Sequence, residues 1–195
     1  MYDSKSVKLM KRIFDLLVAL GLILIFAPLF LLVVLAVRLT SVGPVLFRTQ
    51  RVGKGNKLFT MYKFRTMRID TPQVATHLLK EPDQFLTPIG KLLRRTSLDE
   101  LPQLINVLRG EMSLVGPRPA LFNQDDLIAL RTARRVDALT PGITGWAQVN
   151  GRDELPILEK VKLDEWYLKN RSFWLDLRIL GMTVSKVIRK EGVAH

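Results

Sequence analysis

The longest hydrophobic run lies near the N-terminus, where no charged side chain occurs at the 22 positions from Leu16 to Val37. An α-helix rises 1.5 Å per residue, and about 20 apolar residues cross the hydrocarbon core of a bilayer. The run therefore predicts a membrane segment. Pro28, near its middle, lacks a backbone N–H and clashes with the preceding turn, so a helix must kink or break there.

Positive charge flanks this segment on both sides. The basic residues before it are Lys5, Lys8, Lys11 and Arg12, and those after it are Arg38, Arg48, Arg51, Lys54 and Lys57. A hairpin that enters and leaves one leaflet returns both basic ends to the same anionic surface, so we favour a hairpin. A kinked transmembrane helix is the alternative, since such helices tolerate proline. A cleaved signal peptide is disfavoured because the run exceeds the usual length and no A-x-A-like site follows.

The patterns after this segment predict a β-hairpin and then irregular structure. Two short apolar or aromatic runs, 45–47 and 58–64, are separated by the turn-forming stretch Gly53–Asn56, which is typical of a hairpin. The polar stretch from Ile69 to Leu86 contains two prolines, and we expect irregular structure there with one short helix.

Two helices are predicted around residue 100. Thr87 and Pro88 form an N-cap and N1 pair that opens a short basic helix ending near Arg95. Ser97 and Glu100 have capping-box spacing and predict the start of a second helix, with Pro102 in its first turn. Gly110 is placed to end this helix. Its predicted apolar face consists of Leu101, Leu104, Ile105 and Leu108.

The last third of the chain combines turns with helical patterns. Prolines on both sides of Arg118 predict a rigid turn over 114–119, and the glycines of 140–152 predict a loop. From Asp153 onward the pattern is helical, with apolar residues at 177, 180, 184, 187 and 188. The aromatic residues of this region are Trp166, Tyr167, Phe173 and Trp174. Their position among cations fits either a helix at the lipid head groups or ordinary core packing.

Composition limits the possible partners and chemistry. The formal net charge of +12 favours anionic partners such as lipid head groups, nucleotides, phosphosugars or nucleic acid. The chain has no cysteine, which excludes disulfides, thiolate metal sites and cysteine nucleophiles. Its two histidines, His77 and His195, are far apart in sequence, and we interpret His77 as a surface residue. Any metal would be a hard cation on carboxylate oxygens.

Asp99 and Glu100 are the candidate catalytic residues. One adjacent carboxylate can attack phosphorus, while the other holds a metal or handles a proton. The alternative is that both only stabilise the positive end of a helix dipole. The basic residues that favour a phosphate site are Lys63, Arg65, Arg68, Arg94, Arg95 and Arg118, the last held between Pro117 and Pro119. No P-loop and no G-x-G-x-x-G motif is present.

Several blocks of the chain, in one order, resemble the monotopic polyprenyl-phosphate phosphoglycosyl transferases, also called bacterial sugar transferases. They are the apolar segment with its proline, PVLFRTQRVGKGNKLFTMYKFRTM, RRTSLDELPQLINVLRGEMSLVGPRP and PGITGWAQVNGR. The length is similar to that of the minimal form of the family. Many members carry Ser before the helix-breaking proline, whereas this chain has Ala27. That difference bears on the kink angle more than on the existence of the kink.

The resemblance implies an enzyme that transfers a phosphosugar from a UDP-sugar to undecaprenyl phosphate and releases UMP. Asp99 would form an aspartyl phosphosugar, Glu100 would assist, and Mg²⁺ would neutralise the diphosphate. Arg94 would contact substrate phosphate, and Pro117, Arg118 and Pro119 would shape the nucleotide site. The sugar expected from the late loops is an N-acetylated deoxy-sugar. The expected location is the cytoplasmic face of the bacterial inner membrane, in contact with anionic lipids and without nucleic acid.

The expected fold is a mainly helical α+β architecture. It combines a re-entrant membrane hairpin at 1–40 with a compact cytoplasmic catalytic domain at 41–195, which contains a small β-hairpin and amphipathic interfacial helices. Two other functions stay open. One is a membrane-anchored basic binding module without catalysis, and the other is a glycosyl transferase that passes the sugar without its phosphate and releases UDP.

Overall fold

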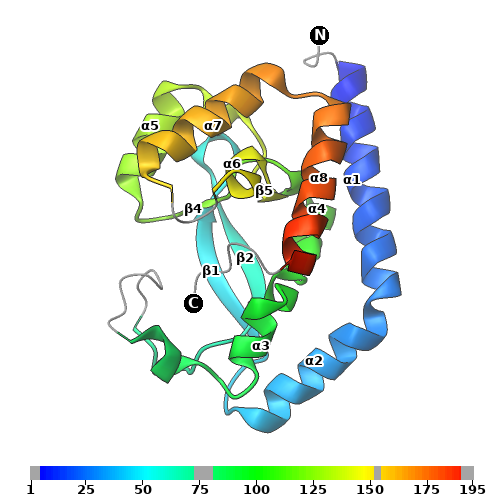
Figure 1. The fold of residues 1–195 in the computed structure, drawn as a ribbon, viewed down its shortest axis with the longest axis vertical. Coiled ribbons are helices and arrows are strands. Elements are labelled where there is room, and N and C mark those ends of the chain that lie inside the picture. The colour runs from blue at the N-terminus through cyan, green and yellow to red at the C-terminus, as the bar shows by residue number, and fades with distance from the viewer. Residues whose placement is uncertain (1–4, 73–80, 152–154, 190–195) are drawn as a thin grey trace.

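The computed structural model describes residues 5–72, 81–151 and 155–189. His77, His195, Arg152 and Asp153 lie outside these ranges, and so does the prediction made for His77. Within them the chain is mainly helical, with one three-stranded and one two-stranded sheet (Figure 1). The prediction of a mainly helical α+β fold is confirmed.

The N-terminal apolar segment forms two helices rather than one. Helix α1 spans Lys5–Ile25 and α2 spans Ala27–Thr40, and the pair is bent by 62° at Phe26. Pro28 lies in the first turn of α2, where its missing N–H breaks no bond within that helix. Among the described residues no single helix is long and apolar enough to cross a membrane, whereas this bent pair meets the length and composition test together. The predicted break at Pro28 is confirmed.

The β-hairpin also forms as predicted. Strand β1 (Leu46–Val52) pairs antiparallel with β2 (Leu58–Phe64), with Leu46 opposite Phe64 and Val52 opposite Leu58. The turn contains a short 3₁₀ segment, Lys54–Asn56, and Gly55 adopts a φ of 63° within it. A two-residue strand, β4 (Ala120–Leu121), pairs with the other edge of β1. Through β4, the hairpin is attached to the segment that carries Arg118.

The two predicted helix starts around residue 100 are wrong. Helix α3 begins at Gly90 and ends at Arg95, because the Thr87 hydroxyl donates to the Thr66 carbonyl (3.3 Å) instead of capping a helix. Ser97 adopts a left-handed conformation with a φ of 55° and makes no capping hydrogen bond. Asp99 and Glu100, the candidate catalytic dyad, therefore lie on a 3₁₀ turn, Leu98–Glu100. Helix α4 (Gln103–Arg109) begins only after Pro102.

The end of α4 follows the prediction. Gly110 adopts a φ of 83° and terminates the helix. The apolar face holds only in part, because Leu104 is buried while Ile105 is half-buried. Two polar residues, Gln103 and Asn106, are buried instead.

The described part of the predicted loop, residues 140–151, is more regular than expected. Gly142–Thr144 forms β5, which pairs in parallel with β3 (Ser113–Val115), and Trp146–Val149 forms the short helix α6. The strands approach closely beside Gly116: a Cβ on Gly142 would lie 2.1 Å from the Gly116 nitrogen. Glycine is required here for close backbone approach rather than for a loop conformation.

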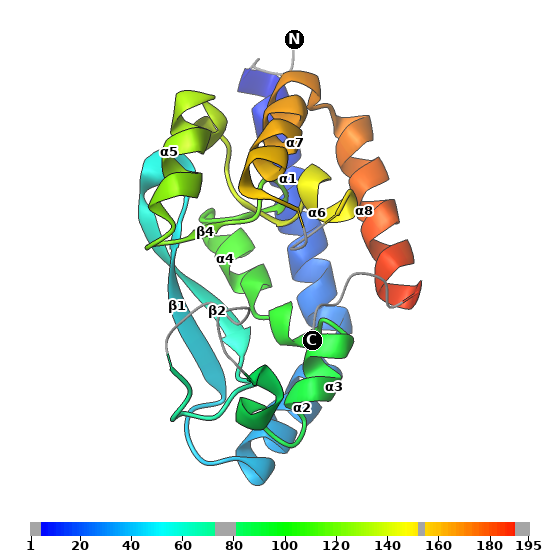
Figure 2. The same cartoon turned by 60° about the vertical axis from the view of Figure 1, so that its left-hand side comes forward.

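The remaining helices surround these small sheets (Figure 2). They are α5 (Asp125–Ala133), α7 (Ile157–Asn170), α8 (Phe173–Arg189) and the 3₁₀ turns Pro82–Phe85 and Val136–Ala138. Helical structure in the last third is confirmed, and among the described residues of 69–86 the turn Pro82–Phe85 is helical, as expected. Core packing is confirmed for Tyr167, which is buried, whereas Trp174 is 78% exposed and its contact with lipid head groups stays a prediction.

Helix α1 belongs to the main core as well as to the apolar segment. Ala19 is fully buried in the same cluster as Met112 and Tyr167. Polar side chains of α1 bind distant parts of the chain: Lys11 pairs with Asp176 (2.7 Å), and Arg12 donates to the carbonyl of Val107 (2.6 Å). The inner face of α1 is therefore joined to the rest of the protein by packing, an ion pair and hydrogen bonds.

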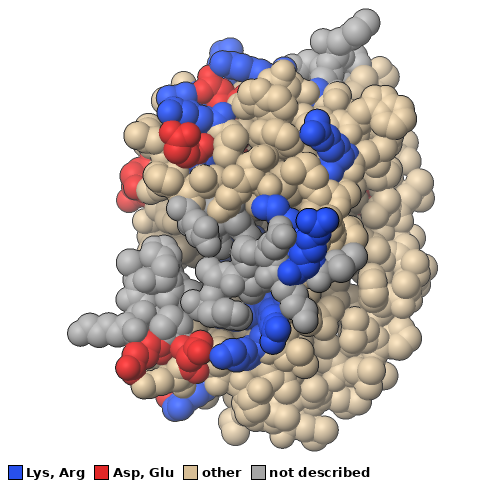
Figure 3. All heavy atoms as spheres, in the orientation of Figure 1, with Lys and Arg blue, Asp and Glu red and all other residues tan. Residues whose placement is uncertain are grey.

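The opposite face of α1 and α2 is apolar and exposed. Its exposed residues are Leu9, Met10, Ile13, Leu17, Leu20, Leu24, Ile25, Phe26, Leu31, Leu32, Leu35 and Leu39. Figure 3 shows this flank at the right as tan surface, with blue spheres gathered over α8 and around α3. An apolar surface of this extent is typical of a contact with membrane or protein.

Candidate active site

The site is organised around the turn that carries Asp99 and Glu100. Lys63, near the end of β2, lies 2.7 Å from Oε1 of Glu100 and 4.0 Å from Oδ2 of Asp99. Arg118 donates to the same Glu100 oxygen at 3.0 Å. The structure thus brings together four of the predicted site residues from three separate segments of the chain.

The turn itself is held against α2. Leu98 and Leu101, on either side of the dyad, pack in a cluster with Phe30, Val33 and Val37 of α2. The turn that presents Asp99 thus shares a hydrophobic cluster with the second helix of the bent pair.

Arg94 approaches Asp99 from α3. Its Nε donates to the Thr66 hydroxyl at 3.0 Å, which fixes the guanidinium beside the dyad. Burial lowers the pKa of Arg94, while the negative charges of Asp99 and Asp83 act in the opposite direction. This environment provides a positive charge on a second side of Asp99.

The two carboxylates have opposite pKa shifts. Burial raises the pKa of Asp99 above 3.8, and the neighbouring Glu100 charge adds to the rise against the lowering effect of Lys63. Burial would also raise the pKa of Glu100, but Lys63 and Arg118 outweigh it and hold that pKa well below its usual range. Neighbouring carboxylates with divergent pKa values are typical of sites in which the two groups have different roles.

The Arg118 turn is restrained by its own carbonyl groups. The amide of Gly142 donates to Pro117 O (2.9 Å), Arg131 donates to Arg118 O (2.8 Å), and Arg51 donates to Pro119 O (3.3 Å). The predicted rigidity of this turn thus depends on three donors from elsewhere, in addition to the fixed φ of each proline.

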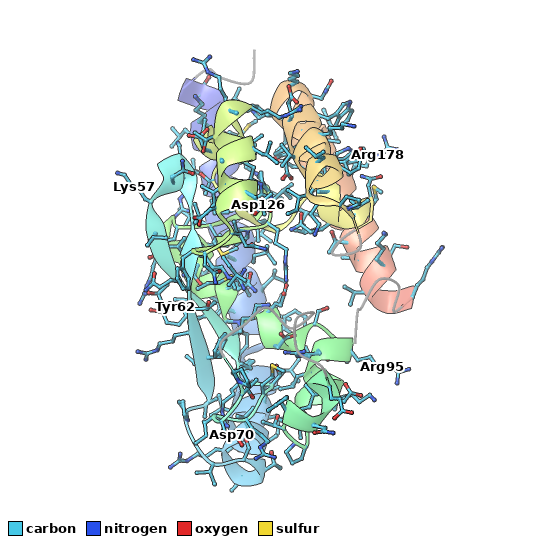
Figure 4. All side chains as sticks on the ribbon, turned by 90° about the vertical axis from the view of Figure 1, so that its left-hand side faces the viewer. Lys57, Tyr62, Asp70, Arg95, Asp126 and Arg178 are labelled. Atoms are coloured by element: carbon cyan, nitrogen blue, oxygen red, sulfur yellow. The ribbon has the colours of Figure 1, made fainter. Side chains whose placement is uncertain are left out.

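Three predicted basic residues do not join this cluster. Arg65 is buried and donates to the carbonyls of Pro44 and Ser41 at 2.7 and 3.0 Å, so it holds the segment after α2. Arg68 pairs with the exposed Asp70. Arg95 is exposed on α3, and Figure 4 shows its side chain directed outward from the molecule.

Two residues near the site were not among the site residues predicted from the sequence. Arg131 on α5 and Asp164 on α7 form a buried ion pair (2.6 Å) behind the Arg118 turn. They are 33 positions apart, so no local motif joins them. The available signal was Asp164 itself, a carboxylate at helical spacing from the buried Val161 and Tyr167.

The carboxylates of Asp99 and Glu100 are suited to binding a magnesium ion together with the phosphates of a substrate. Mg²⁺ is usually bound by one or two carboxylates together with substrate phosphates and water. Both hydrogen bonds from Lys63 and Arg118 reach Oε1 of Glu100, so the oxygens suited to a metal are Glu100 Oε2 and those of Asp99. In the described part of the chain no group of three or more acidic or histidine side chains forms a metal site of its own.

Comparison with known proteins gives one consistent family. The family described as bacterial sugar transferase matches residues 6–190. The uncharacterized sugar transferase EpsL of Bacillus subtilis (strain 168) is 47% identical, over 95% of this chain and 90% of the relative.

Relatives with a stated activity are longer proteins. The UDP-glucose:undecaprenyl-phosphate glucose-1-phosphate transferase of Escherichia coli (strain K12) is 42% identical, over 92% of this chain and 40% of its own length. The UDP-N-acetylgalactosamine-undecaprenyl-phosphate N-acetylgalactosaminephosphotransferase of Aeromonas hydrophila is 40% identical, over 91% of this chain and 43% of its own. This chain therefore spans less than half of each of these two relatives. The family match and these relatives show that the chain belongs to the bacterial sugar transferases and is a phosphoglycosyl transferase.

Proposed function

We propose that this protein transfers a phosphosugar from a UDP-sugar to undecaprenyl phosphate through an aspartyl-phosphosugar intermediate, and releases UMP. The observation that carries the proposal is the division of roles at the dyad. Glu100 accepts hydrogen bonds from both Lys63 and Arg118, whereas the nearest cation to Asp99 is Lys63 at 4.0 Å. Asp99 is the carboxylate that remains available to a substrate.

In the first step an Asp99 carboxylate oxygen attacks the β-phosphorus of the UDP-sugar. The bond from that phosphorus to the bridging oxygen breaks, and UMP leaves with the electron pair. Lys63, Arg94 and Arg118 surround Asp99 with positive charge that stabilises the oxygens of the transferred phosphoryl group. A raised pKa makes the Asp99 carboxylate more basic and hence a better nucleophile once ionised.

In the second step a phosphate oxygen of the acceptor attacks the same phosphorus, and the Asp99 carboxylate leaves. The product is a sugar linked to the polyprenyl carrier by a diphosphate. When bound at the dyad, Mg²⁺ would neutralise negative charge on the diphosphate of the donor. Glu100 would hold the ion through Oε2 while keeping Lys63 and Arg118 in position through Oε1.

The bent pair α1–α2 supports a monotopic position at the cytoplasmic face of the bacterial inner membrane. We propose that the exposed apolar face enters one leaflet and that the break at Pro28 returns the chain to the same side. Because Leu98 and Leu101 pack on α2, this arrangement would hold Asp99 near the head groups, where a soluble UDP-sugar and a membrane-bound acceptor meet.

The sugar is a finer part of the proposal. The relatives named above use glucose and N-acetylgalactosamine, so membership of the family alone does not choose between sugars. We retain an N-acetylated deoxy-sugar as the proposed donor. A screen of UDP-sugars for UMP release with undecaprenyl phosphate would identify it.

Asp99→Asn tests the nucleophile. The variant keeps the size of the side chain but removes the negative charge, so UMP release should fall to background. When the acceptor is omitted, the wild-type protein should gain the mass of one phosphosugar at Asp99, and the variant should not. Asp126→Asn, an exposed carboxylate on α5, is the matched control and should keep wild-type turnover.

Three results would contradict the proposal. Normal turnover in Asp99→Asn excludes the aspartyl intermediate. Release of UDP instead of UMP identifies a glycosyl transferase. Steep salt-dependent binding to DNA without UMP release supports the basic binding module.

A further inference from the structure

The ion pair between Asp164 and Arg131 lies behind the proposed site and outside its chemistry. The Asp164 side chain is 1% exposed and that of Arg131 is 12% exposed. Buried ion pairs are weak contributors to stability, because desolvation of both charges offsets their attraction. Burial indeed raises the pKa of Asp164 above 3.8 against the lowering effect of Arg131. Stability alone therefore gives little reason for this pair.

Asp164 holds Arg131 in one orientation. Its Oδ2 accepts from Arg131 Nε at 3.0 Å and from NH2 at 2.6 Å. The guanidinium group is planar, so two bonds to one carboxylate fix the direction of the remaining NH1 donors. NH1 points at the carbonyl oxygen of Arg118, 2.8 Å away.

A small, partly open pocket of about 30 Å³ adjoins the Arg118 turn, and its lining includes Pro117, Arg118, Pro119 and Arg131. On the other side of the turn the Arg118 side chain reaches Glu100 at 3.0 Å. A continuous chain of contacts thus runs from α7 through α5 to the dyad.

We propose that Asp164 is a positioning residue for phosphosugar transfer: through Arg131 it fixes the main chain of Arg118, and so keeps the Arg118 guanidinium on Glu100 and beside the transferred phosphoryl group. This inference rests on the proposed function. Asp164 contacts neither substrate nor the reacting atoms, and its whole effect passes through Arg118.

Asp164→Asn is the first test. Asparagine keeps one oxygen for Arg131 but removes the charge that holds two of its donors, so Arg118 becomes less well placed. We expect kcat for UMP release to fall about 10- to 100-fold, with a much smaller change in KM for the UDP-sugar, since misplacement affects the transition state most.

A double-mutant cycle separates positioning from general destabilisation. With Arg118→Ala already present, Asp164→Asn should lower the rate by no more than about 2-fold, because the residue through which it acts is gone. Single-turnover measurements with enzyme in excess make the slow rates of these variants accessible. A loss of the same size in both backgrounds overturns the proposal, and so does an unchanged kcat in Asp164→Asn alone.

The chain supplies a matched control. Arg134, the residue that follows α5, and Glu165 of α7 form a second ion pair between the same two parts of the chain, and neither residue is hydrogen-bonded to the Arg118 carbonyl. Glu165→Gln should therefore leave kcat unchanged. If it lowers kcat as much as Asp164→Asn does, the effect belongs to helix association and the proposal fails.

Arg131→Lys covers the case in which Asp164→Asn does not fold. Lysine keeps a positive charge beside Asp164 but cannot serve both Asp164 and the Arg118 carbonyl, so the same loss of kcat is expected, and wild-type kcat would overturn the proposal. Absence of UMP release by the wild-type protein with every UDP-sugar would instead overturn the proposed function. An active wild-type enzyme with unaffected variants overturns only the role of Asp164.

Discussion

Adjacent residues can have very different environments, and Asp99 and Glu100 are an example. Glu100 accepts hydrogen bonds from Lys63 and Arg118, so its pKa is low despite burial. Asp99 has weaker compensation for its burial, and its pKa is raised. Lys63 acts on both carboxylates and is the cation with the largest lowering effect on each.

Lys63→Met should shift the pH dependence of UMP release. Loss of the ammonium removes the main influence that lowers the pKa of Asp99, so that pKa rises further. Because the attacking form is the carboxylate, the acid limb of the pH–rate profile for single-turnover UMP release should move to higher pH. Lys57→Met, an exposed lysine next to the hairpin turn, should leave the limb in place (Figure 4). An unshifted limb in Lys63→Met would show that Asp99 does not limit the rate.

Elements in this protein meet at points where there is no space for a side chain. Where β3 and β5 pair in parallel, a Cβ on Gly142 would lie 2.1 Å from the Gly116 nitrogen and 2.4 Å from the Thr144 oxygen. Both are backbone atoms and cannot move aside as a flexible side chain can.

Gly142→Ala should therefore destabilise the fold, by about 3 kcal/mol as for other overpacked cores. The Gly142 amide also donates to the carbonyl of Pro117, next to Arg118, so UMP release should fall together with thermal stability. The comparison is Gly21→Ala in α1, where a Cβ would meet nothing within 4 Å and alanine favours the helix. The melting temperature of each variant is measured by thermal unfolding in detergent. Equal melting temperatures would show that the backbone around β3 and β5 adjusts to the added methyl group at little cost.

Local patterns predicted the elements that depend on local interactions. The hairpin and the helix end at Gly110 follow from turn residues within a few positions of each other. The helix starts failed for different reasons: the Thr87 hydroxyl binds the distant Thr66 carbonyl, and Ser97 adopts a left-handed conformation that is incompatible with a capping box. Strand β5 was missed because its partner Ser113 lies in a distant segment.

The candidate site could be predicted in part for the same reason. Asp99, Glu100, Lys63 and Arg118 stand out by charge and by their neighbours in sequence, although only the fold brings Lys63 within 4 Å of both carboxylates and Arg118 within 4 Å of Glu100. Arg65 has the same charge as these cations but follows the last residue of β2, where it binds the carbonyl of Pro44. Its role depends on a contact 21 positions away, which composition does not reveal.

For the molecule as a whole, the proposed position of the site at a membrane depends on the topology of the bent pair. A one-leaflet hairpin places both ends of the pair on one side, whereas a kinked transmembrane helix places them on opposite sides. The chain has no cysteine, so single cysteines give an unambiguous label.

Ser6→Cys and Val42→Cys test this topology, since both positions are exposed. In intact spheroplasts an impermeant maleimide should label neither site, and after lysis it should label both, because both ends face the cytoplasm in the hairpin. Labelling of one site before lysis would establish a spanning helix and refute the monotopic arrangement.

The contacts of α1 also affect the order of events during synthesis. Its partners Val107, Ser113 and Asp176 follow Arg12, Asp15 and Lys11 by 95, 98 and 165 positions. At ordinary rates of translation the helix waits on the order of ten seconds before Asp176 exists. During that time an exposed apolar helix is open to aggregation unless a bilayer covers its outer face. The first helix made is therefore among the last to complete its contacts, and early contact with lipid would protect the nascent chain.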